Sequence, residues 1–141
     1  MHELSTEEIA QELNRIFAEE VEAAIRYLHL GNAVRGVERL IVEPKLRAGF
    51  QETIQHAEVI ARKIRELGVV PKLELSISLP SDSIGAKEAF ELALTFEEAL
   101  LEAYQDLLKR IEGDIPLEEF IRSQIAIESG HIGELKQLLA E

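Results

Sequence analysis

Apolar residues recur at alternating spacings of four and three along the first part of the chain, which is the pattern of a helix with one buried face. Ser5 and Glu8 form a capping-box pattern, so we expect this helix to run from about Thr6 to about Val34. The positions that keep the period are Ile9, Leu13, Ile16, Glu20, Ala23, Tyr27, Leu30 and Val34.

Three further segments repeat this pattern. The second predicted helix ends at Leu67 before Gly68 and Pro71, and Pro44 either opens it or kinks a helix begun near Val37. The third is predicted from about Ala86 to Ile111, and the fourth follows a turn and cap at Asp114–Pro116.

The connections between the predicted helices differ in length. Gly36 and Gly113 indicate short turns, whereas residues 69–85 have no helical period and residues 72–79 alternate like an extended segment. Two short turns and one long crossover predict an all-α four-helix bundle made of two antiparallel hairpins. At 141 residues, we expect a single domain spanning residues 1–141.

Metal-capable polar residues interrupt these apolar stripes. Glu20 and Glu97 occupy core positions in the first and third helices, Glu128 and His131 do so in the fourth, and His56 lies beside the stripe of the second. Burying an ionised carboxylate is costly without a countercharge, and the stripes contain no Lys or Arg. Glu128 and His131, three residues apart, project from one helix face and can share a cation. Carboxylate and imidazole donors suit iron, manganese or zinc.

Composition narrows the classes of function. The chain has 27 acidic and 15 basic residues, and its net charge of −12 argues against a nucleic-acid partner. The charge favours attraction of cations, although solubility alone explains it as well. The absence of cysteine excludes thiolate zinc sites and rubredoxin or iron–sulfur centres. With no apolar stretch of the roughly 18–20 residues that a membrane helix needs and no signal-like start, we expect a cytoplasmic protein without a membrane partner.

These residues and their flanking segments resemble the ferritin-like superfamily, and bacterioferritin most closely. The similar segments are residues 20–29, 55–58, 67–71 and 127–135, so the resemblance covers nearly the whole chain. The family centre uses one Glu from each of two helices and Glu-x-x-His from each of the others. The resemblance therefore implies a ferritin-like bundle with two iron ions. In it Glu20 and Glu97 are terminal ligands, Glu128 is a bridging ligand, His56 and His131 are imidazole ligands, and the three glutamates are the catalytic residues.

Three departures from the bacterioferritin pattern change these expectations. The glutamate expected three residues before His56 is Thr53, and Glu52 would take its place only through a local bulge or register shift. The haem-ligand methionine falls at Ile54, so the haem site should be absent. The sequence reaches Glu141 without the short fifth helix of the 24-subunit cages, which argues against a storage shell.

The resemblance implies oxidation of Fe(II) by oxygen or peroxide, for iron detoxification or sequestration, in a homodimer or a larger homo-oligomer. Two alternatives stay open: a degenerate module that binds one metal ion or none and acts in assembly, and a rubrerythrin-like peroxidase that takes electrons from a separate donor. The candidate supporting residues are Thr53, Glu52, Tyr27, Tyr104 and Gln124, and for Thr53 and the two tyrosines a simple packing role is the alternative.

Overall fold

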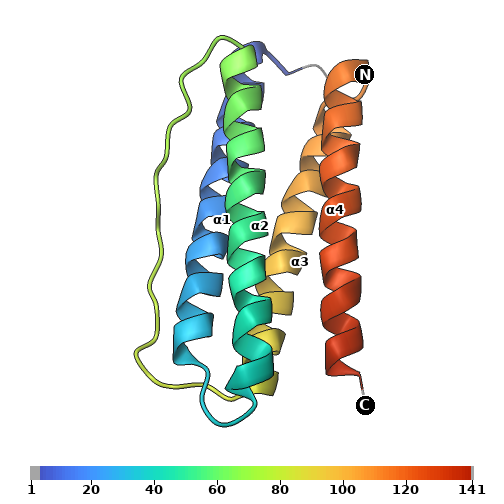
Figure 1. Ribbon diagram of the computed structural model, residues 1–141. Coiled ribbons are helices and arrows are strands. Elements are labelled where there is room, and N and C mark those ends of the chain that lie inside the picture. The colour runs from blue at the N-terminus through green and yellow to red at the C-terminus, as the bar shows by residue number, and fades with distance from the viewer. Residues whose placement is uncertain (1–3, 141) are drawn as a thin grey trace.

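The structure, a computed structural model, describes residues 4–140 and is built from four long helices (Figure 1). Their bounds are α1 (Thr6–Ala33), α2 (Arg39–Glu66), α3 (Ala86–Arg110) and α4 (Ile115–Leu139), within about two residues of those predicted at most ends. Helix α2 starts before Pro44, which therefore lies inside the helix rather than opening it. Among the described residues, no helix combines the length and apolar content that crossing a membrane requires.

The helix ends follow the local signals in the sequence. At the start of α1 the Glu8 amide donates to Ser5 Oγ at 3.1 Å and the Ser5 amide donates to Glu8 Oε1 at 3.0 Å, which completes the capping box. Asp114 caps α4 through its side chain. Gly68 and Gly113 follow α2 and α3 with φ of 84° and 101°, a conformation that favours glycine and ends a helix.

The long connection between α2 and α3 runs back along the outside of the first hairpin (Figure 1). Its contacts with α1 include three hydrogen bonds: the Lys72 amide donates to Asn14 Oδ1 at 2.9 Å, the Ser76 amide donates to Glu22 Oε2 at 2.7 Å, and the Ile84 amide donates to the Ala33 carbonyl oxygen at 2.9 Å. Because the connection returns to the end of the bundle where α2 begins, α3 runs parallel to α2 and α4 antiparallel to both.

The core consists of two apolar clusters that each draw residues from all four helices, with a polar layer between them. One cluster includes Ile60 and Ile121, and the other includes Leu46 and Leu135. The residues of the polar layer are no more than 1% exposed: Glu20, Thr53, Glu97 and Glu128. Burial of the two clusters drives the helices together, and their packing holds the polar layer out of solvent.

Candidate metal centre

Three glutamates from three helices converge in the polar layer. Glu20 comes from α1, Glu97 from α3 and Glu128 from α4. Within residues 4–140, one oxygen of each has no hydrogen-bond partner although it is buried: Glu20 Oε1, Glu97 Oε1 and Glu128 Oε2. A buried carboxylate oxygen without a partner is costly, and a cation would satisfy all three at once. This donor set fits a metal ion of the carboxylate-binding class.

A tyrosine from the opposite hairpin holds each of the two outer glutamates. Tyr27 on α1 donates its hydroxyl to Glu97 Oε2 on α3 at 2.9 Å. Tyr104 on α3 donates to Glu20 Oε2 on α1 at 2.6 Å. The arrangement is nearly twofold, and in both cases the tyrosine occupies one carboxylate oxygen while the other stays free for a ligand.

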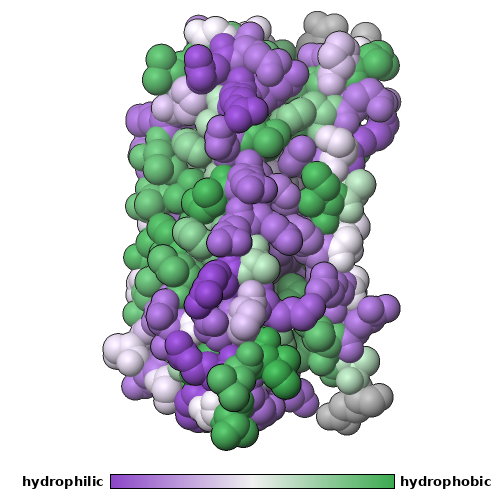
Figure 2. Space-filling model, in the orientation of Figure 1, coloured by the Kyte–Doolittle hydropathy of each residue, from purple (hydrophilic) through white to green (hydrophobic). Residues whose placement is uncertain are grey.

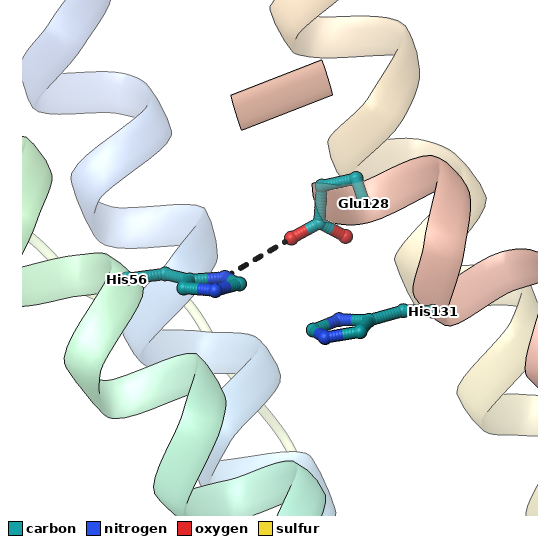
Figure 3. Close-up of side chains that lie close together, drawn as sticks. All are labelled: His56, Glu128 and His131. Carbon is teal, nitrogen blue, oxygen red and sulfur yellow. Dashed lines mark ion pairs between the residues drawn. The ribbon is translucent and has the colours of Figure 1, made fainter. Parts of the chain in front are cut away.

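Two histidines complete the cluster. The rings of His56 on α2 and His131 on α4 are stacked, with centroids 5.4 Å apart and planes 8° from parallel. His56 Nδ1 lies 3.4 Å from Glu128 Oε1 and 3.9 Å from Glu20 Oε2, whereas His131 Nδ1 lies 3.3 Å from Glu97 Oε2. His56, Glu128 and His131 each offer a ligand atom, and these atoms lie within 4.8 Å of one another (Figure 3). The structure thus brings together all five residues predicted as ligands.

On α2, the position at which the family pattern has a bridging glutamate holds no carboxylate. Thr53 is buried at that position, and α2 continues without a bulge through Glu52. Glu52 therefore does not replace the missing bridge. Its half-exposed side chain instead places Oε2 2.9 Å from His131 Nε2, a contact that the sequence pattern does not predict. Gln124 is buried one turn before Glu128, and its supporting role stays a prediction.

Burial and mutual repulsion change the protonation of the site. Burial, followed by the charge of Glu128, raises the pKa of Glu20 to about 8. Burial, followed by the charge of Glu97, raises the pKa of Glu128 to about 9. Burial alone would raise the pKa of Glu97, but hydrogen bonds from His131, Glu128 and Tyr27 outweigh it and leave that pKa below its usual value. The hydrogen bond to Glu97 raises the pKa of His131 to about 9. Without a metal at neutral pH, the site therefore holds one Glu97–His131 ion pair and two neutral carboxyl groups.

A cavity of about 240 Å³ joins this site to the surface along the seam between α2 and α4. At its outer rim, Lys45 Nζ lies 2.9 Å from Glu134 Oε1, and both side chains are about half exposed. Its inner wall includes Glu97 and His131, and Glu52 lies beside them. The seam thus gives small ions and molecules a route to the buried carboxylates.

Gly49 on α2 allows the close approach of Tyr27. A Cβ atom at this position would lie 2.6 Å from Cε1, 2.8 Å from Cδ1 and 2.9 Å from Cζ of the Tyr27 ring. The Tyr27 ring also makes an edge-to-face contact with Phe96, at 4.8 Å between centroids and 86° between planes. Gly49 therefore sets the position from which the Tyr27 hydroxyl reaches Glu97.

Replacing Gly49 with alanine is expected to destabilise the protein. Overpacking against the Tyr27 ring costs about 1–3 kcal/mol, which exceeds the helix-propensity gain of about 1 kcal/mol that alanine brings. The matched control is Gly133→Ala on α4, where a Cβ meets nothing within 4 Å and only the propensity gain should remain. Urea unfolding of both variants measures the difference, and an equal stabilisation by the two changes would contradict the close packing of Tyr27 on α2.

Comparisons with known proteins agree with this architecture. The ferritin-like domain family matches residues 10–141, and no curated protein matches the sequence. The structure is similar to a ferritin-like diiron-carboxylate protein from Bacillus anthracis, with 26% identity, a TM-score of 0.82 and coverage of 97% of this chain and 100% of that chain.

Two further similar structures are a bacterioferritin-related protein and a bacterioferritin. The first is a dodecameric, bacterioferritin-related thioferritin from Bacteroides fragilis, at 23% identity, TM-score 0.84 and coverage of 96% of this chain and 86% of that chain. The second is the bacterioferritin of Rhodobacter capsulatus, at 23% identity, TM-score 0.82 and coverage of 99% and 86%. The resemblance predicted from the sequence is confirmed at the level of fold and family: the chain belongs to the ferritin-like domain family.

Proposed function

We propose that the chain forms one domain and is a bacterioferritin-like iron-binding protein that oxidises Fe(II) with oxygen or peroxide, for iron detoxification or sequestration. The observation that carries this proposal is the convergence, beside two stacked histidines, of three buried carboxylate oxygens that have no hydrogen-bond partner in the described part of the chain. Membership of the ferritin-like family supports it, as does the likeness to a Bacillus anthracis protein described as a diiron-carboxylate protein.

The geometry supports two neighbouring metal positions. Glu20 and His56 would hold one ion, Glu97 and His131 would hold the other, and Glu128 would lie between them. Glu128 is placed for this role because its Oε1 faces His56 Nδ1 at 3.4 Å and it lies close enough to Glu97 for the charge of Glu97 to raise its pKa. Manganese or zinc would fit the same donors, but iron supplies the one-electron chemistry that the proposed oxidation needs.

The residues of the chain orient the ligands and manage protons. The Tyr27 hydroxyl binds one oxygen of Glu97, and the Tyr104 hydroxyl binds one oxygen of Glu20. These hydrogen bonds fix both side chains before a metal ion binds. The raised pKa values of Glu20 and Glu128 mean that both must release protons when they bind a cation. The surrounding apolar clusters keep bulk water away from the polar layer.

Anaerobic reconstitution with Fe(II), followed by removal of loosely bound ion and metal analysis, tests the proposal. We expect two irons per chain, with the ion beside His56 held more weakly because Thr53 supplies no carboxylate. Oxidation of the bound Fe(II) by oxygen or peroxide, followed optically, tests the reaction. One iron or none would contradict the two-metal proposal and favour the degenerate module with an assembly role.

Thr53→Glu should strengthen the weaker position, on the order of tenfold or more, by restoring a carboxylate next to His56. Thr53→Val is the matched control, because it keeps the shape of the side chain and adds no ligand. Metal titration of the two variants measures the change. If Thr53→Glu leaves the metal affinity, the stoichiometry and the rate of Fe(II) oxidation at the values of the control, the proposed inequality of the two positions is wrong.

We also infer that the chain forms a homodimer or a larger homo-oligomer. Leucines on α1 and the long connection expose large apolar side chains: Leu28 49%, Leu73 47%, Leu75 44% and Leu79 41%. Figure 2 shows hydrophobic side chains gathered along the left edge, where Figure 1 places this connection. Isologous pairing through this side would cover these side chains, which favours a dimer. Light scattering tests the inference, and a monomer at micromolar concentration would contradict it.

A further inference from the structure

His131 has a carboxylate at each of its two ring nitrogens. On the buried side Nδ1 lies 3.3 Å from Glu97 Oε2, and on the solvent side Nε2 lies 2.9 Å from Glu52 Oε2. The carboxylate contacts of His56 within residues 4–140 all involve Nδ1. The two histidines of the site are therefore held differently, and the difference arises from Glu52.

A histidine that binds a metal needs a lone pair on the nitrogen that faces the ion. A neutral imidazole has one N–H and one lone pair, and the hydrogen bond at the second nitrogen decides which nitrogen carries the proton. An ionised carboxylate can only accept, so Glu52 keeps a proton of His131 on Nε2. In the metal-free protein Nδ1 is paired with Glu97, and the proton of Nδ1 is the one that leaves when a metal ion binds. Nδ1 is then the nitrogen that offers a lone pair to the ion.

We propose that Glu52 is the positioning residue of His131: its carboxylate accepts a hydrogen bond from Nε2–H and presents Nδ1 to the metal position beside Glu97. This inference rests on the proposed function, because it assigns a role toward the same metal site. Glu52 acts through His131 and not as a ligand, because the His131 ring lies between its carboxylate and the buried glutamates. The side chain of Glu52 also stays about half exposed at the cavity.

The proposal gives a physical account of the substitution at position 53. Helix α2 turns Thr53 into the core and leaves Glu52 on the side that faces α4 across the seam. The helix therefore contributes a carboxylate to the orientation of His131 in place of one that would bridge two ions. The metal position beside His131 becomes the stronger of the two as a result.

Zinc binding by the full-length chain tests the proposal, since Zn(II) is diamagnetic and does not change oxidation state. Glu52→Ala is expected to weaken the tighter zinc site by about 10–100-fold, the usual loss when the partner of a metal-bound histidine is removed. Glu52→Gln keeps a hydrogen-bond acceptor and should stay within about threefold of the unchanged protein. Glu134→Ala is the matched control, because Glu134 lines the same cavity and is 58% exposed. It makes no ion pair with His131 among residues 4–140. Its loss should lower zinc affinity by less than about threefold.

Long-range proton–nitrogen NMR of the zinc-loaded protein provides the second measurement. We expect His131 to carry its proton on Nε2, with slow exchange in the unchanged protein and in Glu52→Gln and fast exchange in Glu52→Ala. Equal zinc affinities for Glu52→Ala and Glu134→Ala would overturn the positioning role. Glu52→Gln as weak as Glu52→Ala would overturn it too, and would make Glu52 a ligand or a simple charge.

Failure of the proposed function is separable from failure of this inference. If the unchanged chain binds neither zinc nor Fe(II), the metal site itself is wrong. The same NMR experiment on the metal-free chain then decides the role of Glu52. Slow exchange of His131 Nε2–H that is lost only in Glu52→Ala supports the positioning role. Slow exchange that persists in Glu52→Ala overturns it.

Discussion

Replacing Glu128 with leucine is expected to abolish most metal binding and, at the same time, to stabilise the metal-free protein. Glu128 lies between the two proposed metal positions: its Oε1 is 3.4 Å from His56 Nδ1, and the nearby charge of Glu97 raises its pKa. Its loss removes a ligand from both positions. We expect affinity to fall by at least about 100-fold, more than the loss caused by an indirect partner of a ligand, and Fe(II) oxidation to fall with it.

The gain in stability follows from the same burial. Glu128 is 1% exposed, its Oε2 has no hydrogen-bond partner among residues 4–140, and burial raises its pKa to about 9. A buried polar group without a partner costs about 1–3 kcal/mol, and leucine of similar size removes that cost while joining the apolar clusters on either side. The free energy of unfolding in the presence of a chelator should rise by a similar amount.

Glu119→Leu is the matched control for this experiment. Glu119 lies on the same helix and carries the same charge, but its side chain is 70% exposed and contacts Arg122. It should change neither metal content nor stability appreciably. A Glu128→Leu protein with its full metal content would sink the ligand assignment, and a marked loss of stability without metal would show that Glu128 is compensated within the chain.

The sequence predicted the parts of this site that depend on helical periodicity. Glu20, Glu97 and Glu128 interrupt apolar stripes, and an ionisable residue at such a position must enter the core whatever the neighbouring helix does. The helix ends could be predicted for a similar reason, because the capping box of Ser5 and the turn at Gly113 are local signals.

Other contacts depend on the rotation of each helix about its axis and on the axial offset between neighbouring helices. The periodic pattern of apolar residues does not contain that information. The equal spacing of Glu20–Tyr27 and Glu97–Tyr104 was visible in the sequence, but the exchange of partners between hairpins was not. The contact between Glu52 and His131 was missed for the same reason, since it crosses the seam between α2 and α4.

The stability of the metal-free protein is expected to fall as the pH rises from about 5 to about 9. Glu20 has an ordinary pKa of 4.5 and a pKa of about 8 in the folded protein, so between these values the unfolded chain binds fewer protons and folding becomes less favourable. Glu128, at about 9, acts in the same direction. The stabilisation from His131, whose pKa rises from 6.5 to about 9, is complete below pH 6.5 and is lost as the pH rises to about 9.

Glu97 sets the acid side of the profile. Because its pKa is lowered in the folded protein, Glu97 stabilises the fold at pH values above its ordinary pKa of 4.5. This stabilisation is lost as the pH falls through the pKa of Glu97 in the folded protein. Together the four groups place the maximum near pH 5. From there to pH 9 we expect a decrease in melting temperature of about 5 °C or more in the presence of a chelator, which corresponds to about 2 kcal/mol for a chain of this size.

A bound metal ion is expected to reverse this dependence of stability on pH, because its positive charge compensates the carboxylates that become ionised at high pH. Zinc affinity should rise with pH up to about 9 as Glu20, Glu128 and His131 release their protons, and titration in weak buffer should detect that release. Melting curves from pH 5 to 9, with chelator and with zinc, measure both effects. Glu128→Leu should flatten the chelator profile because one of the three titrating groups is gone. A metal-free protein whose melting temperature rises over this range would show that the glutamates are already ionised and paired, and a cation would then not be needed to hold the layer together.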